Sequence, residues 1–179
     1  MSVSSAWVVR TARLKMTPVG HWDLADLIRL KGDPRAYSFM LGGVRGPIQV
    51  GEELSHDIQD WGQFGYGMWA VRGLRGKFLG MTALMRRPDG RGVALRFAFL
   101  PEARGVGLAS EATSAALNYA HDVAGLERVV AVAREENFAS RAVLGAIGMS
   151  QVSDFYRDGN LLFIYQSLRV QHFLVNSRS

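Results

Sequence analysis

The chain has 179 residues, of which 48% are hydrophobic and 21% charged, a composition typical of a globular protein with a sizeable core rather than of a disordered chain. It contains no cysteine, which excludes disulfides, a thiolate nucleophile and a cysteine-based zinc site. The net charge of +5 suits an anionic partner, such as a phosphorylated cofactor, an acidic substrate or nucleic acid, although a charge of this size can also serve solubility alone.

Several functional classes are disfavoured by the same residues. No window approaches the roughly 20 apolar residues of a membrane-spanning helix, so we expect no membrane partner. The first ten residues hold no basic segment followed by an apolar stretch, so we expect no secretory signal and a cytoplasmic location. The arginines are scattered and do not alternate with aromatic residues, which makes nucleic-acid binding the weakest reading. No spacing of two histidines and a carboxylate predicts a metal site.

The N-terminal part of the chain predicts one strand followed by two helices. Ala12–Thr17 alternates apolar and polar residues as a strand does, and Pro18 ends it. Asp23 opens a helical pattern that Gly-Asp-Pro at 32–34 should stop. A second helix is predicted at Val50–Gln63, where apolar residues recur along one face.

From Gly67 the pattern changes to strands, and later helices and strands alternate. Three strands at Met68–Arg72, Phe78–Arg87 and Val93–Leu100 are predicted to form an antiparallel meander. The rest of the chain predicts a helix at Gly107–Val123, a strand at Arg128–Ala133, a helix at Phe138–Ile147, and strands at Ser150–Tyr156 and Leu161–Arg169. This order favours an α+β fold in α/β/α layers, with a central mixed sheet and helices on both faces. We expect one domain over residues 1–179 with its core at about 10–169, and a loose tail at 170–179.

The turn at Arg104–Ala109 is the main functional candidate. Gly105 and Gly107 let the backbone approach a ligand closely, and the helix that follows points its first N–H groups into the turn. A diphosphate fits such a site, and Arg104 can add a charged contact. The dinucleotide fingerprint G-x-G-x-x-G is a rival, since Glu127 lies at the ribose-binding distance, but that residue should precede the next strand rather than end it.

At this point the chain resembles the GNAT acetyltransferase family. Arg104-x-x-Gly107-x-Ala109 matches the family's Q/R-x-x-G-x-G/A motif. Thr11-Ala12-Arg13-Leu14 resembles the opening of the ribosomal-protein N-acetyltransferase-like branch, and the segments that follow fall in that branch's order: Gly67–Val71, the strand with Gly80, Glu111-Ala112 and Asn137–Ser140. Gly148-Met149 stands where the family usually has Gly-Phe. The similarity covers roughly residues 11–169. It implies the GNAT acyl-CoA acyltransferase fold, with a mostly antiparallel sheet of six to seven strands.

The resemblance also implies a cofactor, acetyl-CoA, and the residues that hold it. In this family the pantetheine arm lies in a gap between two splayed strands, the turn holds the pyrophosphate, and the Asn motif contacts the pantetheine. Asn137 is also a favoured helix cap, and the two roles are compatible. The implied cofactor-binding residues are Phe99, Leu100, Arg104, Gly105, Val106, Gly107, Leu108, Ala109, Asn137 and Ser140.

Acetyl transfer further needs a base and a proton donor, and here the chain departs from the family pattern. The tyrosine that many relatives use as donor is replaced by Leu144, which leaves Ser140 as the implied donor to the thiolate. Ala94 stands where relatives often carry a catalytic glutamate, so no base is identified. Asp154, His21, Asp158 and His56 are candidates without a spacing argument.

Arg96 stands at the family's glycine position, on the strand face that should look toward the acceptor. It is a hypothetical substrate-binding residue that would select an acidic acceptor, or it pairs with an acid such as Asp154 or Glu53. The sequence thus predicts an acetyl-CoA-dependent N-acetyltransferase acting on a primary amine, a protein N-terminus or a small molecule. The alternative is a non-catalytic acyl-CoA-binding module or sensor that has lost the base. Exposed sheet edges also allow a homodimer.

Overall fold

A mixed sheet forms the centre of the computed structural model, which describes residues 3–178. Its eight strands lie in the order β1-β2-β3-β4-β5-β6-β8-β7, and every neighbouring pair is antiparallel except β5 and β6. The strands are β1 Val9–Arg10, β2 Leu14–Pro18, β3 Met68–Gly73, β4 Phe78–Arg86, β5 Val93–Phe99, β6 Arg128–Arg134, β7 Ser150–Arg157 and β8 Asn160–Leu168. The two-residue β1 brings the sheet to eight strands, one more than the upper end of the expected six to seven.

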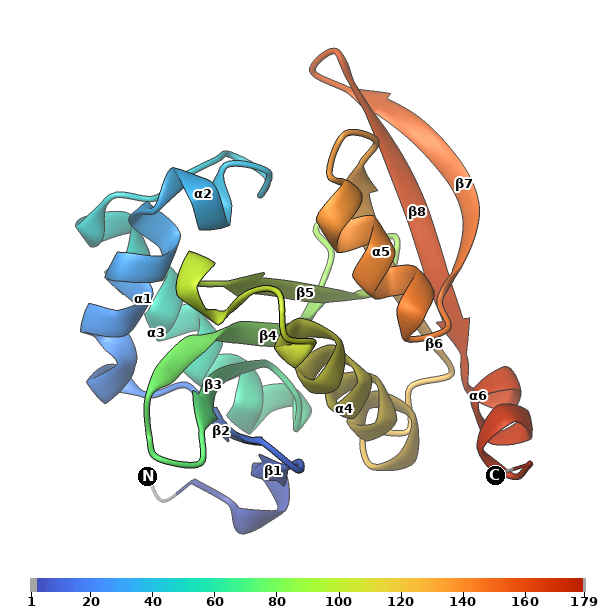
Figure 1. Ribbon diagram of the computed structural model, residues 1–179, viewed down its shortest axis with the longest axis horizontal. Helices are drawn as coiled ribbons and strands as arrows, with labels where there is room; N and C mark the ends of the chain where they lie inside the picture. The colour runs from blue at the N-terminus through green and yellow to red at the C-terminus, as the bar shows by residue number, and fades with distance from the viewer. Residues whose placement is uncertain (1–2, 179) are drawn as a thin grey trace.

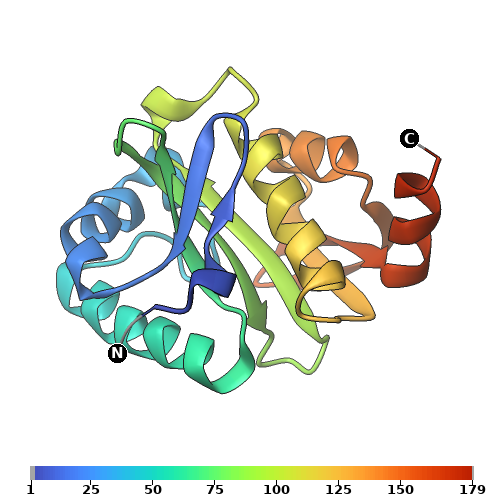
Figure 2. The same ribbon diagram turned by 90° about the horizontal axis from the view of Figure 1, so that it is seen from below.

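Helices cover both faces of this sheet, as predicted (Figures 1 and 2). The α-helices are α1 Leu24–Gly32, α2 Pro34–Tyr37, α3 Pro47–Phe64, α4 Leu108–Asp122, α5 Phe138–Ala146 and α6 Arg169–Asn176. Short 3-10 helices occur at Ser5–Trp7, His21–Asp23 and Pro101–Ala103. Figure 2 shows α1 and α3 on one side of the central strands and α4 and α5 on the other.

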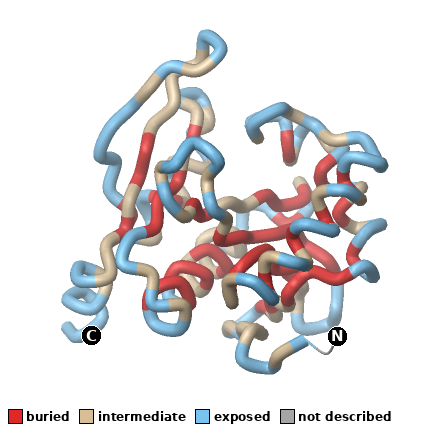
Figure 3. The backbone as a smooth tube through the Cα atoms, turned by 180° about the vertical axis from the view of Figure 1, so that it is seen from behind, coloured by how far each residue is buried: buried red, intermediate tan, exposed pale blue. Residues whose placement is uncertain are grey.

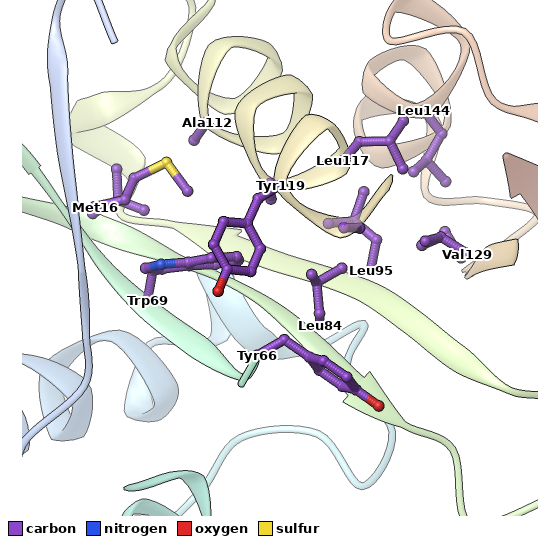
Figure 4. Packing of buried hydrophobic residues seen from close by; sticks show 14 of the residues in the cluster. Met16, Tyr66, Trp69, Leu84, Leu95, Ala112, Leu117, Tyr119, Val129 and Leu144 are labelled. Atoms are coloured by element: carbon purple, nitrogen blue, oxygen red, sulfur yellow. The ribbon is translucent and has the colours of Figure 1, made fainter. Parts of the chain in front are cut away.

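Alternation along the central strands supplies both cores. In β3, Met68 and Ala70 pack in the cluster beneath α1 and α3, whereas Trp69 and Val71 pack in the cluster beneath α4. Trp69 stands edge-on to Tyr119 of α4, with ring centroids 5.1 Å apart (Figure 4). The central strands are therefore buried on both faces, while most of the β7–β8 hairpin is only partly covered (Figure 3).

Gly80 sets how closely β5 approaches β4. A Cβ at this position would lie 2.3 Å from the carbonyl oxygen of Ala98 and 2.8 Å from the Cα of Phe99. No side chain fits in that space, so glycine is required where β4 crosses the end of β5. This close approach fixes the position of the last residues of β5, next to the candidate site.

Two segments differ from the sequence-based expectation. Pro34 begins the short helix α2, because proline is well suited to the first helical position and Asp33 accepts a hydrogen bond from the N–H of Arg35. The tail expected to be loose at 170–179 instead begins with most of a helix, α6, which spans Arg169–Asn176. In addition, His121 of α4, for which the helical pattern gave no sign of burial, is fully buried and bonds Leu126 O at 2.7 Å and Ser167 Oγ at 2.9 Å, and this burial lowers its pKa.

Candidate functional site

The sheet opens between its two parallel strands. β5 pairs with β4 along its whole length, but it pairs with β6 at a single position, Ala94 with Val130. Beyond that pair the strands diverge, and a cavity of about 760 Å³ opens between them. We call it the main cavity. The residues that line it come from β5 and β6, the start of α4, the start of α5, the loop after α2 and the tip of the β7–β8 hairpin. Figure 1 shows how these elements are arranged.

The backbone of β5 presents alternate residues to this opening. Leu100 donates its N–H to the Leu79 carbonyl and accepts from the Ala103 N–H, both at 2.9 Å, so its polar backbone groups already have partners. In this structure the Leu100 N–H is therefore not available for the pairing with pantetheine that the resemblance implied. Because the backbone N–H and C=O groups of successive residues point to opposite edges of a strand, the backbone groups of Phe97 and Phe99 point toward β6 instead. Sequence reasoning missed Phe97, although counting two residues back from Phe99 would have found it.

The glycine turn has the geometry expected of an anion site. Gly105 and Gly107 adopt φ values of +86° and +79°, which favour glycine, and α4 begins directly after them at Leu108. The amides of Leu108, Ala109 and Ser110 lie in the first turn of that helix, where N–H groups lack partners within the helix. All three residues line the main cavity, so the positive end of the α4 dipole faces it.

Arg104 differs from its predicted role. Its backbone N–H is donated to the Pro101 carbonyl at 3.2 Å, and its guanidinium bonds the carbonyls of Arg35 at 2.6 Å and Phe99 at 3.3 Å. These contacts join the turn to α2 and to the end of β5. In this structure Arg104 braces the turn and does not offer its amide to an anion.

Two motifs that are far apart in the sequence meet beneath the turn. Glu111, in the first turns of α4, accepts from Thr11 Oγ1 at 2.5 Å and from Arg13 Nε at 2.7 Å. Arg13 also donates to the carbonyl of Val106, inside the turn, at 2.7 Å. Burial of the Glu111 carboxylate opposes its ionisation, but the hydrogen bonds from Thr11 and Arg13 outweigh this effect and lower its pKa. The network holds the turn against the helix.

On the opposite wall, the Asn motif begins α5. Asn137 caps the helix, since its Oδ1 accepts from the N–H of Ser140 at 3.2 Å, and its Nδ2 carries two donors besides. Asn137 and Ser140 both line the main cavity. Leu144 stands at the place of the absent tyrosine and is 1% exposed. It packs in the core beneath α4 and also lines the main cavity.

The candidate acids and bases differ in whether they line the main cavity. Ala94 is buried at the wall of the main cavity and supplies no carboxylate there. Asp158 is the one acidic residue among those described that lines this cavity. His56 lines a smaller side cavity instead, whereas His21 and Asp154 line neither.

The side cavity has a volume of about 240 Å³ and shares Arg96 and Met85 with the main cavity. Asp57 of α3 lies at its wall and is 3% exposed, and its Oδ2 has no hydrogen-bond partner within residues 3–178. The nearest cation in an ion pair with it is Lys31, whose Nζ lies 3.9 Å away. Burial raises the pKa of Asp57 to about 6. Sequence reasoning gave no signal for this residue, because an aspartate in an amphipathic helix normally faces solvent.

Residues 13–150 match the family described as acetyltransferase (GNAT) domain. The chain belongs to the GNAT acetyltransferase family. It is 26% identical over 170 residues to the FsC-acetyl coenzyme A-N(2)-transacetylase of Aspergillus fumigatus, which covers 87% of this chain and 70% of that protein.

Solved GNAT-fold structures show the same architecture. An acetyltransferase from Agrobacterium tumefaciens has a TM-score of 0.81 at 23% identity, covering 93% of this chain and 95% of its own. The spermidine N-acetyltransferase from Vibrio cholerae, solved with CoA and spermine, has a TM-score of 0.76 at 16% identity. That match covers 91% of this chain and 99% of the Vibrio chain. These likenesses confirm the GNAT fold; membership of the ribosomal-protein branch stays a prediction. Among residues 3–178, no helix of this GNAT protein is long and apolar enough to cross a membrane.

Proposed function

We propose that the protein transfers the acetyl group of acetyl-CoA to a primary amine, by direct attack of the amine in a ternary complex. The opening of the sheet beyond Ala94 carries this proposal, because it places the first turn of α4 and an edge of β5 that β6 does not pair with on one cavity. The pyrophosphate would bind the amides that follow Gly107, and the pantetheine would pair with Phe97 and Phe99. The volume of about 760 Å³ leaves room for an acceptor beside the thioester.

In the reaction, the amine nitrogen bonds the acetyl carbon, the C–S bond breaks, and the nitrogen loses a proton while the thiolate gains one. Ser140 is the proposed donor to the thiolate, since it is the hydroxyl of the Asn motif and lines the main cavity. A serine hydroxyl is a weak acid, but a thiolate is a good leaving group that needs little assistance. Positioning supplies much of the acceleration in such a transfer.

A second candidate function is acyl-CoA binding without turnover. The absence of a carboxylate at Ala94 favours it, because an ammonium acceptor must lose a proton before it attacks. A titration calorimeter with acetyl-CoA, followed by a free-thiol release assay on peptides, polyamines, aminoglycosides and amino acids, separates the two. Binding with release of thiol on at least one amine supports the transferase. Binding without release on the whole panel supports the sensor, and no binding contradicts both.

A further inference from the structure

Arg96 presents a guanidinium to the main cavity without an oxygen partner. Its Nη1 lies 3.7 Å from Met85 Sδ, and its Nη2 lies 3.9 Å from Met40 Sδ. A thioether sulfur is a weak acceptor, whereas a guanidinium carries five N–H donors. Neither Asp154 nor Glu53, the acids expected to pair with it, forms an ion pair with Arg96 in the part of the chain that the structure describes. The carboxylate of Glu53 is instead held by Lys31 at 2.8 Å and Arg45 at 2.7 Å.

The other partly buried arginines of the main cavity differ from Arg96 in this respect. Arg45 pairs with Glu53, Arg134 lies 3.6 Å from Glu136, and both Arg87 and Arg157 pair with Asp89. Arg104 and Arg35, near the turn, are exposed and bonded as well. Arg86 is exposed, and its guanidinium lies over the Phe64 ring. Among the partly buried arginines of the main cavity, within residues 3–178, Arg96 is therefore the one whose guanidinium has no oxygen partner.

Its surroundings keep this guanidinium in place. Arg96 lies between Ala94 and Ala98 on the same face of β5, so no larger side chain competes for the space in front of it. The charged groups facing the shared wall with the side cavity are Lys31, Glu53 and Asp57. Lys31 forms an ion pair with Glu53. Asp57 forms no ion pair with Arg96 within the described residues, but the positive charge of Arg96 lowers the Asp57 pKa and so opposes the effect of burial.

The charge of the main cavity as a whole points in the same direction. Of the residues that the structure describes, eight arginines line it, against one acidic residue, Asp158. Such a field concentrates anions and repels a polycationic acceptor. Part of it suits the phosphates of the cofactor, but Arg96 adjoins Phe97, beside the strand edge proposed to hold the pantetheine. A small acceptor can therefore reach Arg96 and the thioester at once.

We propose that Arg96 binds a carboxylate on the acceptor, so that the substrate is an amine that also carries a carboxylate, such as an amino acid. This inference rests on the proposed N-acetyltransferase function. A guanidinium takes a carboxylate through two parallel hydrogen bonds, which fixes the orientation of the acceptor as well as its position. In a partly dry cavity these bonds discriminate strongly against the same amine without its carboxylate.

The test compares matched acceptors on matched variants. Each L-amino acid is paired with its carboxamide, which keeps the amine and replaces the carboxylate by a neutral group. Thiol release gives kcat/KM for both members with wild type, Arg96→Gln, Arg96→Lys and the control Arg75→Gln, which removes an exposed arginine that lines neither cavity. Arg96→Met, which suits the neighbouring methionines, replaces the glutamine variant if that variant does not fold.

We expect the kcat/KM ratio of acid to carboxamide to fall by about tenfold or more in Arg96→Gln, to recover in part in Arg96→Lys, and to stay at the wild-type value in Arg75→Gln. Calorimetric titration of the CoA-bound protein with the preferred acid should show the same order of affinities. Equal losses on acid and carboxamide would overturn the inference, and so would a wild-type preference for carboxamides or for spermidine. Those results leave the transferase function standing. Failure of every carboxylated amine to bind or react, with acetyl-CoA bound, also overturns it.

Discussion

Replacing Asp57 by asparagine should stabilise the protein at pH 8 and leave its stability nearly unchanged at pH 4. Burial raises the pKa of Asp57 from 3.8 to about 6, so the folded state resists ionisation of this carboxyl more than the unfolded state does. Because its pKa is raised on folding, the carboxyl does not lower the free energy of unfolding below pH 3.8, and it lowers that free energy by the full amount above about pH 6. The wild type therefore loses stability from this group as the pH rises through that range.

The size of the effect follows from the same two values. At about 1.4 kcal/mol per pKa unit, the rise from 3.8 to about 6 means that ionised Asp57 lowers the free energy of unfolding by about 3 kcal/mol at pH 8. The carboxyl is 3% exposed, so solvent screening reduces this figure little. Asparagine keeps the shape of the side chain and carries no charge, and it therefore resembles the protonated aspartic acid at every pH.

Urea unfolding of both proteins at pH 4, 6 and 8, followed by circular dichroism, measures this difference. Glu53→Gln is the control of opposite sign. Burial of Glu53 opposes its ionisation, but the hydrogen bonds from Lys31 and Arg45 outweigh this effect and lower its pKa. Glu53 therefore stabilises the folded state fully above pH 4.5, and this stabilisation is lost as the pH falls. That variant should be less stable than wild type at pH 8, by about 2 kcal/mol. Equal stability of wild type and Asp57→Asn at pH 8, or a gain that does not change with pH, would refute the reasoning.

Two further substitutions test the parts that position the site. Gly80→Ala should lower the free energy of unfolding by about 1 to 3 kcal/mol, since its Cβ would lie 2.3 Å from the Ala98 carbonyl oxygen, whereas Gly51→Ala, with open space around it, should raise the melting temperature slightly. Calorimetric melting of both proteins checks this, and equal shifts would contradict the close approach. Glu111→Gln should weaken acetyl-CoA binding by about threefold to tenfold, because Arg13 loses the carboxylate that holds it under the turn; unchanged affinity would show that the network does not support the site.

Local chemistry made most of the fold predictable. The helices and strands of the sheet follow from their periodicity, and the turn at Gly105 and Gly107 follows from the need for positive φ before a helix. The short helix α2 was missed for a local reason. The same Gly-Asp-Pro residues that stop α1 also provide a cap and a first-turn proline for the next helix.

The missed site details depend on contacts between distant residues. The N–H of Leu100 is taken by Leu79 across the β4–β5 pair, and no local pattern reveals which edge of a strand a residue uses. His121 is buried because Ser167, on another strand, completes its hydrogen bonds. The unpaired state of Arg96 likewise depends on Lys31 and Arg45, which take up the nearest acid from other elements.

Calorimetric titration with acetyl-CoA tests the central claim most directly, when wild type is compared with Ser110→Glu and Asn118→Glu. Residue 110 lies in the first turn of α4 at the main cavity, and residue 118 is exposed farther along the same helix. A carboxylate at position 110 stabilises the helix N-terminus but repels a diphosphate bound there, so affinity should fall by about tenfold or more. Asn118→Glu should bind as wild type does. No binding by wild type, or equal binding by all three proteins, would contradict the assignment of this turn to the cofactor.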